Sequence, residues 1–383
     1  MRRLLVLTLV AALGSSLPII EAVSPSSIRS AIAGQAPFPQ PGRDRKPASH
    51  VQLPDDARSA FIAKAQVWKP TDIATMDLRS GPQGSTTWEP NQVVTCDYVE
   101  RPMHGNTRKF FCQISEGDIV KVRYGDHNGE VQGSVLATRL LWALGFVADR
   151  VYPVRVRCRG CSSDPWNSRA RTKGVTEFDP AVIERKPAGR EMWNGDRKSG
   201  WVWPELDLVD PGQGGAPLEH RDALKLLAVF MQHADTKRQQ QRLLCAADSL
   251  SAAGVCEAPF LLLHDVGVTF GRANGFNHNG TGSVNLAEWR RTPVWKDAGA
   301  CIGDLSKSHT GSLGDPQISE KGRQFLADLL AQLTDQQVRE LFEVAGVERR
   351  GGSSDSVSAA RIDEWIAAFN HKRDEIASAR CDH

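Results

Sequence analysis

Eight cysteines restrict what this chain can fold into more than any other feature. An even number of cysteines is typical of chains that fold in an oxidising compartment, where disulfides form. Three pairs are close in the sequence and a fourth follows by elimination: Cys96–Cys112, Cys158–Cys161, Cys245–Cys256 and Cys301–Cys381. Residues 158–161 also match the CxxC pattern of redox and zinc sites, but the sequence contains no second CxxC. We therefore predict disulfides at all four pairs. Closing the Cys96–Cys112 loop stabilises the fold by about 3 kcal/mol.

The N-terminus predicts export. Two arginines precede an apolar run, and small residues follow it up to Ala22. This is the layout of a secretory signal peptide. The alternative is an uncleaved membrane anchor, but the run is shorter than the roughly 20 residues that a membrane span needs. We expect a signal peptide over residues 1–22, a flexible lead-in over residues 23–57, and a secreted or periplasmic protein with no integral membrane span after cleavage.

The charge composition excludes one class of partner. The chain has 47 basic and 45 acidic residues and a formal net charge of +2. Domains that bind nucleic acid usually carry a clear excess of basic residues. The composition therefore predicts no nucleic-acid partner.

Hydrophobic periodicity predicts a β-rich first half and a mainly helical second half. Runs rich in β-branched and aromatic residues indicate strands at 92–96, 109–112, 118–124, 151–157, 181–184 and 260–264. Apolar residues at helical spacing indicate helices at 130–144, 220–233, 318–333, 335–346 and 357–378. We predict an α+β fold with a β-rich N-terminal lobe over residues 58–185 and a mainly helical C-terminal lobe over residues 186–383.

Four short segments carry side chains that suit phosphoryl transfer. A turn around Gly105 offers backbone N–H groups next to basic residues, and Lys121 lies in the middle of an expected strand. Residues 233–241, HADTKRQQQ, follow an amphipathic helix, and residues 264–267, HDVG, follow an apolar strand. Phosphoryl transfer needs a turn over the phosphates, a cation that neutralises them, a carboxylate that orients the acceptor, and oxygen ligands for magnesium.

The order of these segments resembles that of the protein-kinase-like fold in its atypical branches. The spacing from Asp235 to Gln240 equals the spacing between the catalytic Asp and the metal-binding Asn of the kinase catalytic loop. Asp265 matches the Asp of the D-F-G motif. The chain is also similar to uncharacterised exported bacterial proteins that carry HxDxK and DxGxTFG motifs. The resemblance covers roughly residues 90–345 and implies a two-lobed, protein-kinase-like, disulfide-clipped fold.

The resemblance implies a nucleotide site with four contributors. Lys121 is expected to contact the α- and β-phosphates, with Glu130 on the following helix as its ion-pair partner. The turn at Gly105 is expected to cover the phosphates. Glu184 falls where the hinge between the lobes contacts adenine through its backbone.

The resemblance also implies the reacting groups and the metal ligands. Asp235 is expected to be the acceptor-orienting base, with Lys237 beside the transferred phosphoryl group. Asp265 and Gln240 are expected to bind Mg²⁺ or Mn²⁺. The implied function is that of an exported phosphotransferase that uses ATP and a divalent metal. Its acceptor would be a protein, a glycan or a small molecule, and nucleotidyl transfer is a variant of the same chemistry.

Three alternatives remain open at this point. Gln240 replaces the usual Asn and Gly105 stands alone in its turn, which also fits a catalytically inactive, pseudokinase-type binding module. His233, His264 and Asp265 could instead be ligands of an HD-type metal phosphohydrolase. The tryptophans between residues 193 and 203 could form a recognition surface for a glycan or a peptide, or pack in the interior.

Overall fold

The computed structural model describes residues 51–52, 55–84, 86–193, 200–246, 249, 256–271, 283–305, 310–349 and 361–382. The expected signal peptide, residues 1–22, and most of the expected lead-in, residues 23–57, lie outside this part of the chain. The end of the lead-in does not, and helix α2 (Asp55–Ala63) begins there. The helix therefore already includes residues 55–57 of the expected lead-in. The physical reason is the burial of Phe61 and Ile62, which tie the helix to the core.

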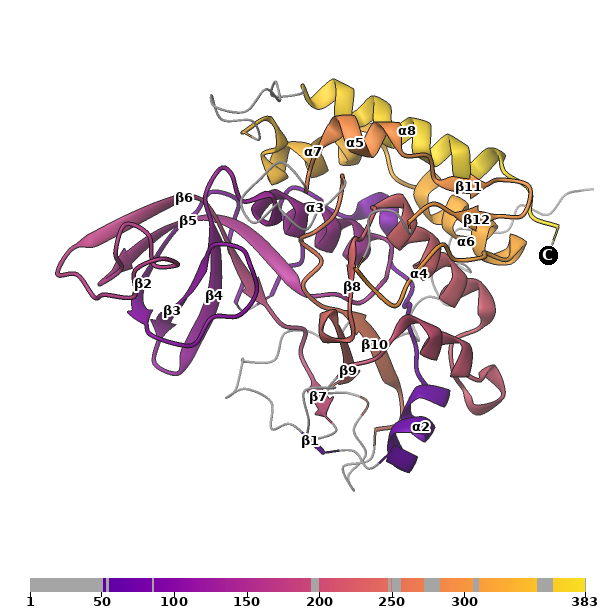
Figure 1. Cartoon of the computed structure of the whole chain (residues 1–383), viewed down its shortest axis with the longest axis horizontal. Helices are drawn as coiled ribbons and strands as arrows, with labels where there is room; N and C mark the ends of the chain where they lie inside the picture. The colour runs from indigo at the N-terminus through magenta and orange to yellow at the C-terminus, as the bar shows by residue number, and fades with distance from the viewer. Residues whose placement is uncertain are drawn as a thin grey trace, which may run out of the picture. The chain divides into compact units, whose positions relative to one another are not determined.

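Five strands close into a barrel in the order β2-β3-β4-β6-β5 (Figure 1). Neighbouring strands are antiparallel, except that β2 and β5 pair in parallel and so close the barrel. The strands are β2 (Val93–Val99), β3 (Lys109–Ser115), β4 (Asp118–Tyr124), β5 (Arg150–Arg159) and β6 (Val175–Arg185).

The sequence alternation explains the interior of this barrel. Val94, Cys96 and Tyr98 are buried along β2 while the residues between them are exposed. Successive side chains of a strand point to opposite faces, so one face of each strand fills the barrel. This interior cluster contains all four cysteines of the disulfides Cys96–Cys112 and Cys158–Cys161. The first of them joins the neighbouring strands β2 and β3.

A second and larger hydrophobic cluster unites the helices. Helix α3 (Gly129–Ala143) is buried on nearly every side because it packs against β5 and α7. Helix α4 packs against α6, and α8 packs against α6 and α7 (Figure 1). The remaining helices are α4 (Leu218–Phe230), α5 (Leu286–Arg291), α6 (Glu320–Ala331), α7 (Asp335–Ala345) and α8 (Ile362–Ser378).

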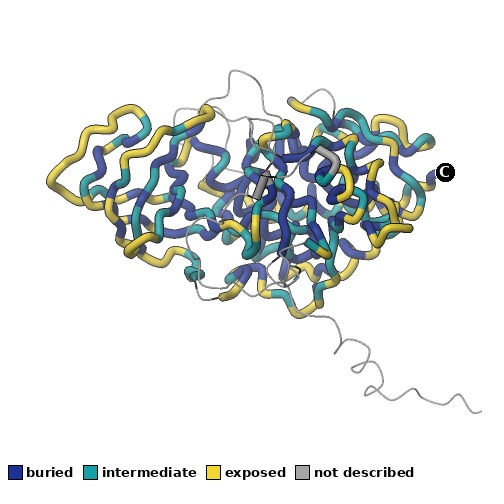
Figure 2. Tube along the Cα trace, turned by 90° about the horizontal axis from the view of Figure 1, so that it is seen from below, coloured by how far each residue is buried: buried dark blue, intermediate teal, exposed yellow. Residues whose placement is uncertain are grey.

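Short strands outside the barrel pair with one another. A four-stranded sheet has the order β1-β7-β9-β10, in which β9 and β10 form an antiparallel pair. Two-stranded pairs join β8 to β13 and β11 to β12. These strands are β1 (Val51–Gln52), β7 (Arg190–Trp193), β8 (Asp235–Thr236), β9 (Gln241–Cys245), β10 (Pro259–Leu263), β11 (Trp295–Asp297), β12 (Ile302–Gly303) and β13 (Thr310–Gly311). In Figure 2, buried backbone runs through the barrel strands and the helical part alike, and exposed residues gather in the connecting segments.

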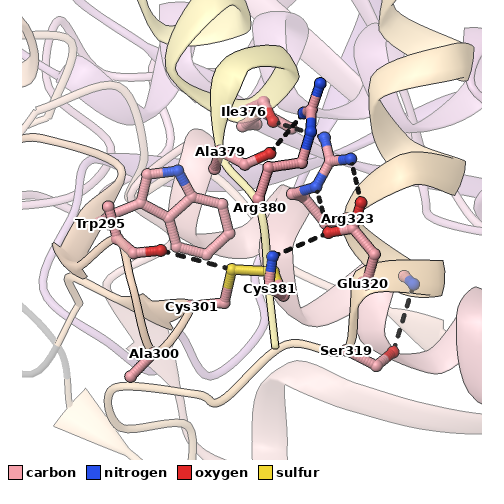
Figure 3. The surroundings of a disulfide bond; sticks show 12 residues. Trp295, Ala300, Cys301, Ser319, Glu320, Arg323, Ile376, Ala379, Arg380 and Cys381 are labelled. Carbon is pink, nitrogen blue, oxygen red and sulfur yellow. Dashed lines mark hydrogen bonds and ion pairs between the residues drawn. A yellow bond between two sulfur atoms is a disulfide. The ribbon is translucent and has the colours of Figure 1, made fainter. Parts of the chain in front are cut away.

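Disulfides also fix the helical part. Cys245–Cys256 closes the segment between β9 and β10, and Cys301–Cys381 joins the region of β11 and β12 to the residues after α8. The backbone N–H of Cys381 donates to Glu320, whose carboxylate also pairs with Arg323 (Figure 3). All four predicted disulfides are thus present, the three favoured by short sequence spacing and the fourth, Cys301–Cys381, that followed by elimination.

Two tryptophans of the tryptophan-rich segment, Trp201 and Trp203, lie in the interior. Trp201 and Trp203 are at most 1% exposed, and their rings contact each other edge to face. The indole N–H of Trp201 donates to the carbonyl of Leu262 in β10. These two rings cannot form a glycan or peptide recognition surface, so that alternative is wrong for them.

None of the helices within the described residues is both long enough and apolar enough to cross a membrane.

Candidate functional site

Strand β4 places two cations on one face. Lys121 and Arg123 are two residues apart, so their side chains project to the same side of the strand. Glu184 of β6 lies directly opposite Lys121 in the strand register. Its Oε2 atom is 2.7 Å from Lys121 Nζ and 2.6 Å from Arg123 Nη1. The two strands thus build a cation–carboxylate cluster from neighbouring positions.

Arg123 joins this cluster to two further elements. Its Nε lies 3.2 Å from Glu130 at the start of α3, and its Nη2 donates to Asp265, which follows β10. The Arg123 side chain is 1% exposed. Burial alone would lower the pKa of Arg123, but the carboxylates of Asp265, Glu184 and Glu130 outweigh burial and raise it. Arg123 is therefore a permanent positive charge shared by three carboxylates.

Glu130 is held at the N-terminus of α3. The side chain of Asn128 caps this helix by accepting from the backbone N–H of Glu130. The hydroxyl of Thr107, in the turn between β2 and β3, donates to Glu130 at 2.9 Å. Burial and the nearby charge of Asp265 raise the pKa of Glu130, although Arg123 acts against them.

The ion pair expected between Lys121 and Glu130 is not formed. Lys121 pairs with Glu184, and Glu130 pairs with Arg123 instead. The reason is the strand register, which places Lys121 opposite Glu184 and leaves Arg123 nearer the end of β4 that leads to α3. Sequence reasoning overlooked Arg123. The two-residue periodicity of β4 was the signal that could have indicated it.

Glu184 lies inside the sheet. It is paired with Lys121 of β4 on one side and with Val151 of β5 on the other. A hinge residue that contacts adenine through its backbone needs unpaired backbone groups. The hinge role predicted for Glu184 therefore does not fit its position, and its side chain belongs to the ion-pair cluster. Its pKa is lowered because Lys121 and Arg123 outweigh the effect of burial.

The loop after β10 brings Asp265 to the cluster. Its backbone is left-handed, with φ +56°. Burial would raise the pKa of Asp265, but Arg123 and Lys121 lower it strongly, so the group is ionised. Gly267 lets this loop lie against α3, because a Cβ at Gly267 would be 2.9 Å from both Cβ and Cγ of Glu130.

Asp235, Lys237 and Gln240 form a second polar group. Lys237 Nζ is 2.9 Å from one carboxylate oxygen of Asp235, and the amide nitrogen of Gln240 donates to the other at 2.8 Å. This segment runs beside the loop after β10. The N–H of His264 donates to the carbonyl of Gln240 at 2.8 Å, and the N–H of Ala234 donates to that of Val268 at 3.0 Å. The structure thus brings the two expected motifs side by side.

Strand β3, which follows the turn at Gly105, contributes a third cation, Lys109. Gly105 has φ +88°, and a Cβ there would lie 2.9 Å from the Nζ of Lys109. Burial lowers the pKa of Lys109, and the neighbouring charge of Arg123 lowers it further, whereas Asp265 and Glu130 raise it. Lys109 is 8% exposed and its Nζ lies 5.7 Å from the ring centre of Trp166. Lys109 is one of the basic residues that the sequence placed beside the Gly105 turn, but no role in the site was predicted for it.

The two histidines are placed differently. His233 is fully buried, and neither of its ring nitrogens has a hydrogen-bond partner among the described residues. His264 hydrogen-bonds through Nδ1 to Asp149, and both lie with Glu184 in a group of possible ligand atoms. Among the described residues, the ligand atoms of His233, His264 and Asp265 do not lie close enough together to share one metal ion. The HD-type metal set expected from those three residues is therefore not formed.

Comparisons with known proteins add little to this geometry. No protein-family model matches the chain, and no curated protein matches it. Among solved structures, the proinflammatory kinase CtkA of Helicobacter pylori is similar, with a TM-score of 0.39 and 9% sequence identity. The similarity covers 76% of this chain and 95% of that chain. At this level of similarity the function has to be inferred from the site itself.

Proposed function

We propose that this chain is an exported phosphotransferase of the protein-kinase-like type, which uses ATP and a divalent metal. One observation carries the proposal. Arg123 on a strand contacts Glu130 on the next helix and Asp265 after an apolar strand. Kinases require the same connectivity, in which a strand lysine pairs with a helix glutamate close to the metal-binding Asp. Here an arginine has the place of that lysine.

The basic residues suit the triphosphate. Lys109, Lys121 and Arg123 come from the strands β3 and β4 that follow the turn at Gly105. Lys121 is partly exposed, and its ion-pair partner among the described residues is Glu184, so it can exchange this partner for a phosphate. Arg123 is held by three carboxylates and is therefore suited to orienting Glu130 and Asp265 rather than to moving.

The donor atoms fit a hard divalent cation. Asp265 provides a carboxylate that the adjacent cations keep ionised. The amide nitrogen of Gln240 is bound to Asp235, which leaves the amide oxygen as a ligand. Oxygen donors of these types are the ones that Mg²⁺ prefers. When bound, the metal would neutralise phosphate charge, and Asp265 and Gln240 are the residues that would hold it.

Asp235 and Lys237 are placed for the acceptor. Asp235 holds Gln240 with one carboxylate oxygen and Lys237 with the other. The side chain of Lys237 is 51% exposed, so it can turn toward a phosphoryl group. Asp235 would orient an acceptor hydroxyl and take its proton. The acceptor is a protein, a glycan or a small molecule outside the cytoplasm, and the four disulfides agree with such a compartment.

Thermal unfolding with nucleotide tests the proposal. Millimolar ATP with Mg²⁺ or Mn²⁺ should raise the melting temperature by several degrees, since a ligand at 100 times its Kd adds about 2.7 kcal/mol. Asp265→Asn should remove the metal-dependent part of the shift. Asp97→Asn is the matched control, because Asp97 is exposed on β2 and pairs with Arg159. The absence of any shift in the unmodified protein would exclude the proposal.

The Arg123–Asp265 ion pair also favours a second candidate, an inactive nucleotide-binding module. Arg123 occupies one oxygen of the carboxylate that a metal needs. An inactive module would bind ATP without a metal and with no loss of affinity in Asp265→Asn. The same melting experiment therefore separates the two candidates.

A further inference from the structure

A second set of donor atoms lies beside the ion-pair cluster. Asp149, Glu184 and His264 each offer a ligand atom, and these three atoms lie within 4.8 Å of one another. The Asp149 side chain is 3% exposed, that of Glu184 6% and that of His264 11%. Donors bound to one metal ion at about 2.1 Å are themselves about 3–4 Å apart, so small side-chain movements are sufficient.

The three residues stand on a rigid frame. Asp149 directly precedes β5, Glu184 lies near the end of β6, and His264 directly follows β10. The β5–β6 ladder extends to the residues next to Asp149 and Glu184. Ala148, which precedes Asp149, forms a parallel β-bridge with Leu263, which precedes His264. Backbone pairing thus fixes all three Cα positions relative to one another, as a preorganised site requires.

The charges around Asp149 favour a bound cation. Within the described part of the chain, its side chain has two partners, His264 Nδ1 and the N–H of Asp265 at 3.5 Å. His264 is positively charged only when it is protonated, and the backbone N–H carries no charge. A buried carboxylate without a cationic partner is costly, and proteins usually satisfy it with a paired charge or a metal.

Each carboxylate also keeps an oxygen for a metal. Lys121 and Arg123 both bind Oε2 of Glu184, and the described residues provide no ion pair or hydrogen bond to its Oε1. Asp149 uses Oδ2 for both of its partners. The two cations on Glu184 and the N–H of Asp265 orient the carboxylates in the way that outer-shell partners orient metal ligands.

We propose that Asp149, Glu184 and His264 bind one divalent transition-metal ion of the Zn²⁺ type. An imidazole with two carboxylates suits zinc or cobalt better than Mg²⁺ or Ca²⁺, which prefer oxygen ligands alone. Three protein ligands leave a position for water, as in catalytic zinc sites. The ion joins β5, β6 and the loop that carries Asp265. The site shares no ligand with the Mg²⁺ pair Asp265 and Gln240, and it does not rest on the proposed phosphotransfer.

Cobalt binding tests this site without nucleotide. The oxidised full chain is stripped with EDTA and titrated with Co²⁺, whose visible absorption bands report coordination. We expect one equivalent to bind and to be displaced by Zn²⁺. His264→Gln and Asp149→Asn should each weaken Co²⁺ binding at least tenfold, whereas Asp265→Asn should retain it. Asp97→Asn is again the surface control.

Two results would overturn the inference. One is the failure of the unmodified protein to bind Co²⁺ in stoichiometric amount. The other is binding that Asp265→Asn abolishes and His264→Gln leaves intact, which would place the metal at the proposed nucleotide site. Should the variants not fold, X-ray absorption of the zinc-loaded unmodified protein decides. An imidazole nitrogen must appear in the metal's coordination shell, and its absence contradicts the proposal. Phosphotransfer is tested separately by the ATP-dependent melting shift.

Discussion

Arg123 has three carboxylate partners from three different elements while its side chain is 1% exposed. A guanidinium suits this position because its five N–H donors lie in one plane and point in several directions. An ammonium group has only three N–H donors, all on one nitrogen, so it spans less distance between its partners than the three nitrogens of a guanidinium. The arginine thus fixes the relative positions of β4, α3 and the loop after β10.

Replacement of this residue should be costly. Arg123→Met leaves Glu130, Glu184 and Asp265 without their shared cation in a buried site. We expect a loss of about 3–5 kcal/mol in the free energy of unfolding, measured by urea denaturation. Arg159→Met is the control, since the pair of Arg159 with Asp97 is exposed, and it should leave stability unchanged. Equal stability of the two variants would contradict a structural role for Arg123.

The same residue shows what sequence reasoning can reach. The pattern of β4 predicted the strand with its observed bounds and drew attention to Lys121. The three partners of Arg123 depend on the register of β4 with β6 and on the path of the loop after β10. Those are contacts between residues as far as 142 positions apart. Local patterns do not encode them.

At the scale of elements, the approach of the loop after β10 to α3 positions the site. A Cβ at Gly267 would touch Cβ and Cγ of Glu130 at 2.9 Å. This loop also carries Asp265, so its distance from α3 decides whether Arg123 can contact Glu130 and Asp265 together.

A single methyl group should disturb this approach. Gly267→Ala should lower the free energy of unfolding by about 1–3 kcal/mol through overpacking and reduce the ATP-dependent melting shift. Gly314→Ala is the matched control, because no atom lies within 4 Å of the Cβ it would add. Urea denaturation and melting with ATP measure both effects. If Gly267→Ala leaves both the free energy of unfolding and the melting shift unchanged, the loop is free to move away from α3.

Elements with strong local signals were predictable and others were not. Thr334 forms the capping box of α7 with Gln337, and this helix was expected within one residue of its observed end. Strand β9 was overlooked, because its sequence Gln-Arg-Leu-Leu-Cys lacks clear alternation and depends on pairing with β10. Strand β6 begins at Val175 rather than near Ala181, since its first half is stabilised by pairing with β5.

For the whole molecule, His233 predicts how stability depends on pH. Burial lowers the pKa of His233 from 6.5 to about 4. Between these values the unfolded chain binds a proton that the folded chain does not bind. Stability is therefore complete above pH 6.5 and falls as the pH decreases toward 4, by about 3 kcal/mol for this group.

Urea denaturation at several pH values between 7 and 4 measures this dependence. His233→Phe places another aromatic ring beside Trp203 and should flatten the decrease below pH 6.5. His371→Phe is the control, since the side chain of His371 is 68% exposed and lies on the surface of α8. It should leave the decrease as it is in the unmodified protein. A steep decrease that persists in His233→Phe would assign the effect to other groups.

The disulfide between Cys301 and Cys381 has a mechanical consequence. It closes a covalent ring with a sequence separation of 80 residues, which includes α6, α7 and α8. A force applied at the C-terminus is transmitted directly to Cys301 near β12 and bypasses the last helix. Helix α8 therefore cannot be peeled from α6 and α7 from its end while the bond is intact. Pulling on the C-terminus, or trimming of the residues after Cys381, therefore leaves these helices enclosed in the ring as long as the bond is intact.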